Sequence, residues 1–223
     1  MTQGKMIALS AAVLAAMLAS ALWVASRLPA DALLPIHWDA YGRADGFAGK
    51  WTALLMMPAI TAFSVLLFWA IPKLEPKREG LERSQGLYLW GWAAVLLTLG
   101  TVHLAVLGTA LGLAVPVARL VAGSVGLMLV LIGNQLGKSR RMYMVGFRTP
   151  WTLASEEVWI KTHRLAGKLM VAGGAAVLAA ALIGAGEPLL IGLLLLAVLI
   201  GVAVPLVYSY LLWRREQADQ PRG

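Results

Sequence analysis

Long apolar runs separated by short polar segments make up most of the chain. A helix needs about 20 apolar residues to cross a hydrocarbon core about 30 Å thick, and the charged residues leave uncharged gaps of this length repeatedly. The pattern therefore predicts an all-α, polytopic membrane protein with six transmembrane helices. The expected spans lie between Lys5 and Arg27, between Lys50 and Lys73, on both sides of a break at Gly108–Pro116, between Lys168 and Glu187, and from Pro188 to about Trp213.

The third and fourth spans come from one uncharged stretch, Ser84–Ala118, which is too long for a single helix. Its segment Gly108–Pro116 concentrates glycine and ends in proline, so we expect a turn there and Arg119 at a membrane surface. In the sixth span, Pro205 predicts a kink. The first apolar run exceeds the ~7 to 15 residues of a cleaved signal peptide, so we expect a retained helix.

The composition supports the same class of protein. Hydrophobic residues make up 60% of the 223 residues and charged residues only 13%, which is about half of the charged fraction of a soluble domain. The chain has no cysteine, which excludes a disulfide framework and a thiolate metal site. We expect no cofactor.

Lysine and arginine divide unequally between the two sets of connections. Fifteen of the nineteen fall on the side that holds both ends of the chain, whereas only Arg27, Arg43, Lys50 and Arg119 fall on the other. Basic residues near helix ends stay in the cytoplasm, so we expect both termini to be cytoplasmic. The net charge of +8 then favours contact with anionic membrane lipids rather than direct nucleic acid binding.

The outward loop Leu34–Trp51 is rich in aromatic residues for a connector. Trp and Tyr favour the headgroup region, so Tyr41 and Trp51 suit an interfacial belt. The alternative is an ordered recognition cap, in which Gly42 and Gly46 permit a positive φ and Asp45 before Gly46 predicts a tight turn, because Asp-Gly is a typical turn pair. His37 and Asp39 would share one face of a strand, but two ligands alone predict no metal site. The ligand-facing residues of the cap hypothesis are His37, Trp38, Tyr41, Gly42, Asp45 and Gly46.

A second polar segment, GFRTPWTLASEEVWIKTHRLAGK, occupies residues 146–168. Thr149 before Pro150 indicates a turn or a helix start. Ser155 followed by two glutamates is typical of a helix N-terminus, where a hydroxyl caps free amides and carboxylates offset the helix dipole. We therefore expect one helix that begins near Ser155 and continues into the fifth span.

On that helix, Glu156, Trp159 and His163 share a face, and Glu157 lies one turn before Lys161. One interpretation is an amphipathic helix at the bilayer surface, with its basic residues near lipid phosphates. Carboxylates beside an anionic leaflet also need cationic partners, so we expect a buried or half-buried polar cluster at the cytoplasmic mouth of the bundle. The expected cluster consists of Arg148, Glu156, Glu157 and His163.

Two further polar side chains fall within the spans. His103 lies in the third span, nearer its outer end, and Asn134 lies near the inner end of the fourth. A polar residue inside a membrane is a functional candidate. The alternative is that one interhelical hydrogen bond satisfies each of them, which would make them structural.

The stretch from Gly133 to Lys168, GNQLGKSRRMYMVGFRTPWTLASEEVWIKTHRLAGK, resembles the signature of the SdpI family of bacterial membrane proteins. The loop LPIHWDAYGRADGFAGK resembles the domain of unknown function that commonly precedes this signature. The resemblance implies a functional motif in the cytoplasmic loop that consists of Asn134, Arg148, Thr149, Pro150, Trp151, Thr152, Glu156, Glu157, Trp159, His163, Arg164 and Gly167.

By this resemblance, the protein would be an immunity or receptor protein of the bacterial inner (plasma) membrane rather than an enzyme. It would give resistance to a secreted peptide toxin met on the extracytoplasmic side, and would signal by sequestering a cytoplasmic repressor. The alternative hypothesis is a membrane-embedded hydrolase or small-solute transporter that uses Glu156, Glu157 and His163. The expected domains are a helix pair at 1–83 with an extracytoplasmic loop at 28–51, a four-helix region at 84–213 with a cytoplasmic motif loop at 135–167, and a polar tail at 214–223.

Overall fold

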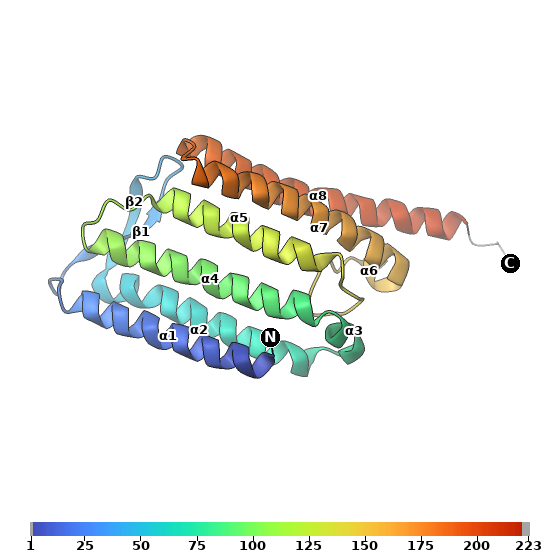
Figure 1. The fold of residues 1–223 in the computed structure, drawn as a ribbon, viewed down its shortest axis with the longest axis horizontal. Coiled ribbons are helices and arrows are strands. Elements are labelled where there is room, and N and C mark those ends of the chain that lie inside the picture. The colour runs from blue at the N-terminus through green and yellow to red at the C-terminus, as the bar shows by residue number, and fades with distance from the viewer. Residues whose placement is uncertain (1, 220–223) are drawn as a thin grey trace.

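The computed structural model describes residues 2–219 as a bundle of long helices with a small β-hairpin at one end (Figure 1). We call the opposite end, which holds α3, α6 and residues 137–149, the polar end. The elements in chain order are α1 (Gln3–Ala25), β1 (Leu33–Trp38), β2 (Ala44–Gly49), α2 (Lys50–Leu74), α3 (Arg78–Arg83), α4 (Gln85–Ala110), α5 (Val117–Leu136), α6 (Pro150–Ala154), α7 (Glu156–Leu182) and α8 (Glu187–Ala218).

Six helices, α1, α2, α4, α5, α7 and α8, are long and apolar enough to cross a membrane. They confirm the six predicted spans. The predicted break is also confirmed, because α4 ends at Ala110 and α5 begins at Val117, with Gly112 between them at a φ of +78°. Pro205 lies inside α8, which continues to Ala218. The tail residue Arg222 lies outside the described residues.

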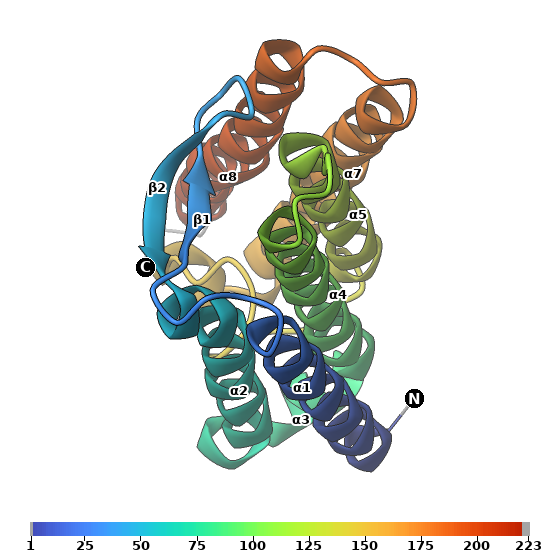
Figure 2. The same ribbon diagram turned by 90° about the vertical axis from the view of Figure 1, so that its left-hand side faces the viewer.

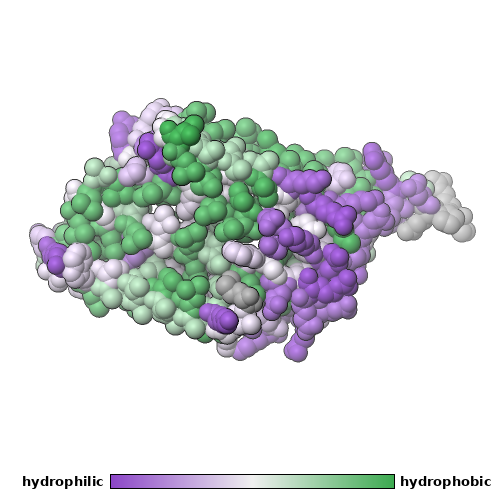
Figure 3. Space-filling view, viewed as in Figure 1, coloured by the Kyte–Doolittle hydropathy of each residue, from purple (hydrophilic) through white to green (hydrophobic). Residues whose placement is uncertain are grey.

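The helices form two groups of three. Helices α1, α2 and α4 pack against one another, and α7 packs against both α5 and α8. Contact between α4 and α5 joins the groups. In the end-on view, the hairpin runs along the edge of the molecule from α2 towards α8 (Figure 2). The space-filling view shows apolar residues along the helices and polar residues gathered near α3 and α6 (Figure 3).

Glycines allow α5 and α7 to approach each other closely at two levels. A Cβ on Gly174 would lie 2.5 Å from the carbonyl oxygen of Gly126, and one on Gly167 would lie 2.6 Å from that of Gly133. Small residues at such positions let helix backbones pack tightly in a membrane, where water provides no driving force between helices. Gly167, expected as a functional residue, therefore has a packing role.

Candidate functional site

The loop that was expected to face outward is an ordered antiparallel hairpin whose turn is formed by residues 39–43. The Asp39 carboxylate accepts hydrogen bonds from the backbone N–H groups of Tyr41 and Arg43, at 2.8 and 2.9 Å, and Gly42 has a φ of +72°. The backbone bond from Arg43 lowers the pKa of Asp39. The turn predicted at Asp45–Gly46 is wrong, because Asp39 and Gly42 close the turn earlier and residues 45 and 46 lie within β2, where Gly46 pairs with His37.

Several of the predicted ligand-facing side chains of the hairpin are exposed. His37 Nδ1 lies 2.6 Å from Asp45 Oδ1, and both side chains are exposed. Tyr41 is 63% exposed. At the tip, a Cβ on Gly42 would collide with the Glu187 carboxylate, so the hairpin contacts the start of α8. The loop is thus ordered, as predicted, whereas its contact with a ligand stays a prediction.

At the polar end, two consecutive helices begin where the sequence predicted helix starts. Thr149 and Thr152 form a capping box at the start of α6, with Pro150 in its first turn. The Ser155 hydroxyl accepts the Val158 N–H at the start of α7, which continues to Leu182 as one helix. A hydroxyl at this position satisfies an amide that the helix itself leaves free.

Two hydroxyls also tie these helix starts to the end of α8. The Thr149 and Ser209 hydroxyl oxygens are 3.3 Å apart, and Ser155 donates to the Glu216 carboxylate at 2.8 Å. The segment 149–155 is therefore held against α8 by polar contacts.

His163 is fully buried and both of its ring nitrogens are occupied. Nε2 accepts the backbone N–H of Phe147 at 2.9 Å, and Nδ1 donates to the carbonyl oxygen of Trp159 at 2.8 Å. The ring stacks on Trp159 with centroids 4.0 Å apart. Since Nε2 accepts a hydrogen bond, the imidazole is neutral in this arrangement. Gly146 has a φ of +114°, and a Cβ there would lie 2.6 Å from Nε2.

The predicted cluster of Arg148, Glu156, Glu157 and His163 is wrong. Arg148 is exposed and donates to the carbonyl oxygen of Tyr143. Glu156 instead faces Arg141, with Nε and Oε2 3.6 Å apart. The Glu157 side chain is 64% exposed, and it pairs with Lys161 as predicted.

The physical reason for this different pairing is the path of the chain before α6. The Arg141 guanidinium donates to the carbonyl oxygens of Leu153 and Ala154, at 2.9 and 3.1 Å. These bonds hold Arg141 beside the start of α7, where its guanidinium faces Glu156. The Arg148 guanidinium bonds to Tyr143 instead.

Glu75, at the end of α2, is a central residue of this site that the sequence did not reveal. The residue is only 3% exposed. It accepts the backbone N–H groups of Tyr143 at 3.0 Å and Met144 at 2.7 Å, and that of Lys77 at 2.9 Å. Charge-assisted bonds of this kind are about twice as strong as neutral ones. Glu75 therefore fastens the motif loop to the amino-terminal half of the protein.

Replacing Glu75 with alanine should lower the free energy of unfolding by about 2 to 4 kcal/mol, because it leaves buried backbone N–H groups unpaired. Glu75→Gln, which keeps one acceptor oxygen, should lose about half as much. Thermal unfolding of the purified protein in detergent would measure both. The control is Glu79→Ala, since the Glu79 side chain is 83% exposed. Equal stability of the Glu75 and Glu79 variants would contradict the anchoring role.

The remaining candidate residues occupy separate places. Asn134 is exposed and lines a shallow hollow between α5 and α7 with Arg164 and Gly167. His103 is buried, and its Nε2 lies 3.1 Å from both the Ser20 hydroxyl and the Met17 carbonyl oxygen of α1. This interhelical contact favours a structural role for His103.

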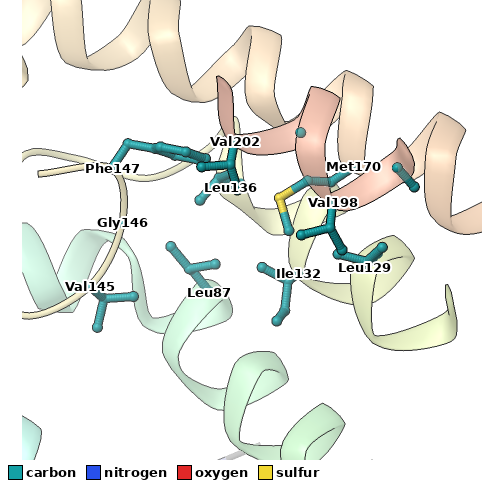
Figure 4. A pocket seen from close by; sticks show the side chains of 12 residues that line it. Leu87, Leu129, Ile132, Leu136, Val145, Gly146, Phe147, Met170, Val198 and Val202 are labelled. Atoms are coloured by element: carbon teal, nitrogen blue, oxygen red, sulfur yellow. The ribbon is translucent and has the colours of Figure 1, made fainter. Parts of the chain in front are cut away.

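An apolar cavity of about 230 Å³ lies among α4, α5, α7 and α8 (Figure 4). Part of its wall is formed by Val145, Gly146 and Phe147. Because the Phe147 N–H bonds to His163, whatever fills the cavity touches the segment that His163 holds. The other lining residues are Leu87, Leu129, Ile132, Leu136, Met170, Ala197, Val198, Gly201 and Val202.

Taken together, the six apolar helices and the hydrogen-bonded polar end define a multi-pass helical membrane protein. Residues 138–209 match the SdpI/YfhL protein family, and residues 12–62 match a domain of unknown function, DUF1648. The chain thus carries an SdpI/YfhL family region after a DUF1648 region, which confirms the resemblance predicted from its two motifs.

One relative is similar along most of its length. The chain is 24% identical over 177 residues to the protein named Immunity protein SdpI from Bacillus subtilis (strain 168), which covers 79% of this chain and 82% of the relative. No solved structure matches the chain. The SdpI/YfhL match includes α6, α7 and most of α8, so it contains His163 and the capping residues of the polar end.

Proposed function

We propose that this protein is an immunity protein of a bacterial inner membrane that gives resistance to a secreted antimicrobial peptide. The observation that carries the proposal is the similarity to Immunity protein SdpI across 82% of that relative. The SdpI/YfhL match over the polar end supports it as well. The similarity includes both the hairpin half and the motif half, so the proposal concerns the whole protein and not one segment.

In this proposal the hairpin faces outward and the polar end lies in the cytoplasm. The uneven distribution of basic residues supports this orientation. The hairpin side chains of His37, Trp38 and Tyr41 meet the peptide. The cytoplasmic motif carries the response, which includes binding a repressor protein. The division into a helix pair at 1–83, a four-helix region at 84–213 and a tail at 214–223 belongs to the same proposal.

A killing assay tests this function. Sensitive bacteria that express the protein should survive a membrane-active peptide from the bacterium that encodes it, and cells with empty vector should not. His37→Ala combined with Trp38→Ala should reduce survival because both side chains belong to the hairpin surface. The matched control is Trp23→Ala, which removes an exposed aromatic residue from α1 at the same end.

The assay also needs a check on orientation and amount. The chain has no cysteine, so a single cysteine placed at Ala44 reports which side the hairpin faces. Full survival of the hairpin variant at wild-type membrane levels would remove the hairpin from the mechanism. If cells that express the wild-type protein died at the same rate as cells with empty vector, the proposed function would be wrong.

The geometry of Glu156, Glu157 and His163 does not support the alternative hypothesis of a hydrolase. Glu156 and Glu157 pair with different cations. His163 is buried, and its two nitrogens bond to backbone groups. A carboxylate and an imidazole must both reach one water molecule to activate it. These three side chains do not converge on such a point, so we propose no reaction for them.

A further inference from the structure

A hollow of about 710 Å³ lies at the polar end, where α3, the motif loop and the start of α7 meet. Residues of the amino-terminal half of the protein and residues of the SdpI/YfhL region both line it. Helix α3 and the loop meet closely at Gly80, since a Cβ there would collide with the carbonyl oxygen of Arg141. The charged residues that line the hollow are Lys77, Arg78, Arg83, Arg140, Arg141, Glu79 and Glu156.

The carboxylates in this hollow do not balance its cations. Glu79 pairs with Arg83 and Glu156 with Arg141. Among residues 2–219, the other three cationic side chains form no ion pair; these are Lys77, Arg78 and Arg140. Like charges that share a hollow repel one another unless an anion binds between them. The hollow is thus suited to a ligand with more than one negative oxygen.

The position of the hollow indicates where such a ligand comes from. It begins at Pro76 and Lys77, directly after the membrane-spanning helix α2. In the last turns of α2, Trp69 is 40% exposed, and Lys73 Nζ lies 3.2 Å from the centre of its ring. Tryptophan at the end of a span marks the interfacial level of a bilayer, where lipid phosphates lie. Basic residues at that level attract anionic lipids.

We propose that this hollow binds the phosphate headgroup of an anionic phospholipid. Arginine suits this role because its planar guanidinium can hold two phosphate oxygens at once. A lipid bound there touches α3 and the motif loop together and stabilises their contact. The inference is independent of the proposed immunity function, because it rests on the charge and position of the hollow alone.

Thermal unfolding of the full chain in non-ionic detergent tests this binding. Phosphatidylglycerol should raise the unfolding temperature, and phosphatidylcholine should not. Lys77→Gln combined with Arg78→Gln should raise the half-maximal phosphatidylglycerol concentration by about tenfold or more, because two attractive charges are removed. Neither side chain donates a hydrogen bond within the described chain, so the variant should fold. Arg140→Gln provides a second variant in the same hollow.

The matched control is Arg214→Gln with Arg215→Gln, which removes two charges from the end of α8, outside this hollow. Its lipid dependence should equal that of the wild type. If both double variants lost the same amount of stabilisation by phosphatidylglycerol, the effect would be one of general charge, and the proposed site would be wrong. If glycerol phosphate stabilised the wild type as strongly as the lipid at equal phosphate concentration, the ligand would be a soluble phosphate and the lipid assignment would be wrong.

Discussion

His163→Ala should lower the free energy of unfolding by about 3 to 5 kcal/mol, the range for removing a large buried ring. The imidazole is fully buried, stacks on Trp159, and accepts the Phe147 N–H. Its removal therefore leaves a cavity and an unpaired backbone donor. Protection from the peptide should be lost with it, because the segment 145–147 is no longer held in place. Thermal unfolding in detergent and the survival assay would measure these effects.

Two further variants separate the ring from its hydrogen bond. His163→Phe keeps a ring for stacking but no acceptor, so it should lose about 1 to 3 kcal/mol. Arg164→Ala changes the neighbouring exposed residue on the same helix and should leave stability near that of the wild type. A stable His163→Ala protein with normal protection would show that the imidazole does not organise the motif loop.

Gly174→Leu should have the second large effect, because it separates two helices that pack backbone against backbone. The added Cβ would lie 2.5 Å from the Gly126 carbonyl oxygen and 2.8 Å from the Leu129 Cβ. A backbone atom cannot move aside as a flexible side chain can, so we expect a loss of about 3 kcal/mol or more. Membrane insertion should persist, since leucine is more apolar than glycine. Resistance to unfolding, measured on protein extracted from membranes, should fall.

The matched control for this helix contact is Gly192→Leu. Gly192 lies in the spanning helix α8, and an added Cβ there meets nothing within 4 Å. The same substitution should therefore be tolerated at that position. If the two variants were equally stable, close approach of α5 and α7 would not be a requirement of the fold.

The two effects concern adjoining parts of one structure. The glycine contacts fix α7 against α5, and α7 carries Trp159 and His163 to the polar end. His163 then holds the loop at Phe147, while Glu75 holds the same loop from α2 at Tyr143 and Met144. The loop is thus fixed from both halves of the protein. A substitution in either half that breaks one of these hydrogen bonds would therefore affect the position of the loop.

The membrane spans and the local helix starts could be predicted from the amino-acid sequence alone. Bilayer thickness sets the length of an apolar run, so the six spans and the break at Gly108–Pro116 follow from composition along the chain. A cap depends on residues three or four positions away, which made Ser155 recognisable as the start of α7. The neighbouring pair Glu157 and Lys161 was predictable for the same reason.

The contacts between groups that are distant in sequence could not be predicted, because they depend on how the helices pack. Glu75 and Tyr143 are far apart in sequence, and nothing local marks Glu75 as the carboxylate that binds the loop. The partner of Glu156 is Arg141 instead of Arg148, because the carbonyl oxygens of α6 hold the Arg141 guanidinium in place. The hairpin turn lies at residues 39–43 instead of at Asp45–Gly46, because His37 pairs with Gly46 and Trp38 with Ala44 across the two strands. Ion pairs and buried hydrogen bonds depend on distances of a few ångströms, and those distances are set only when the helices pack.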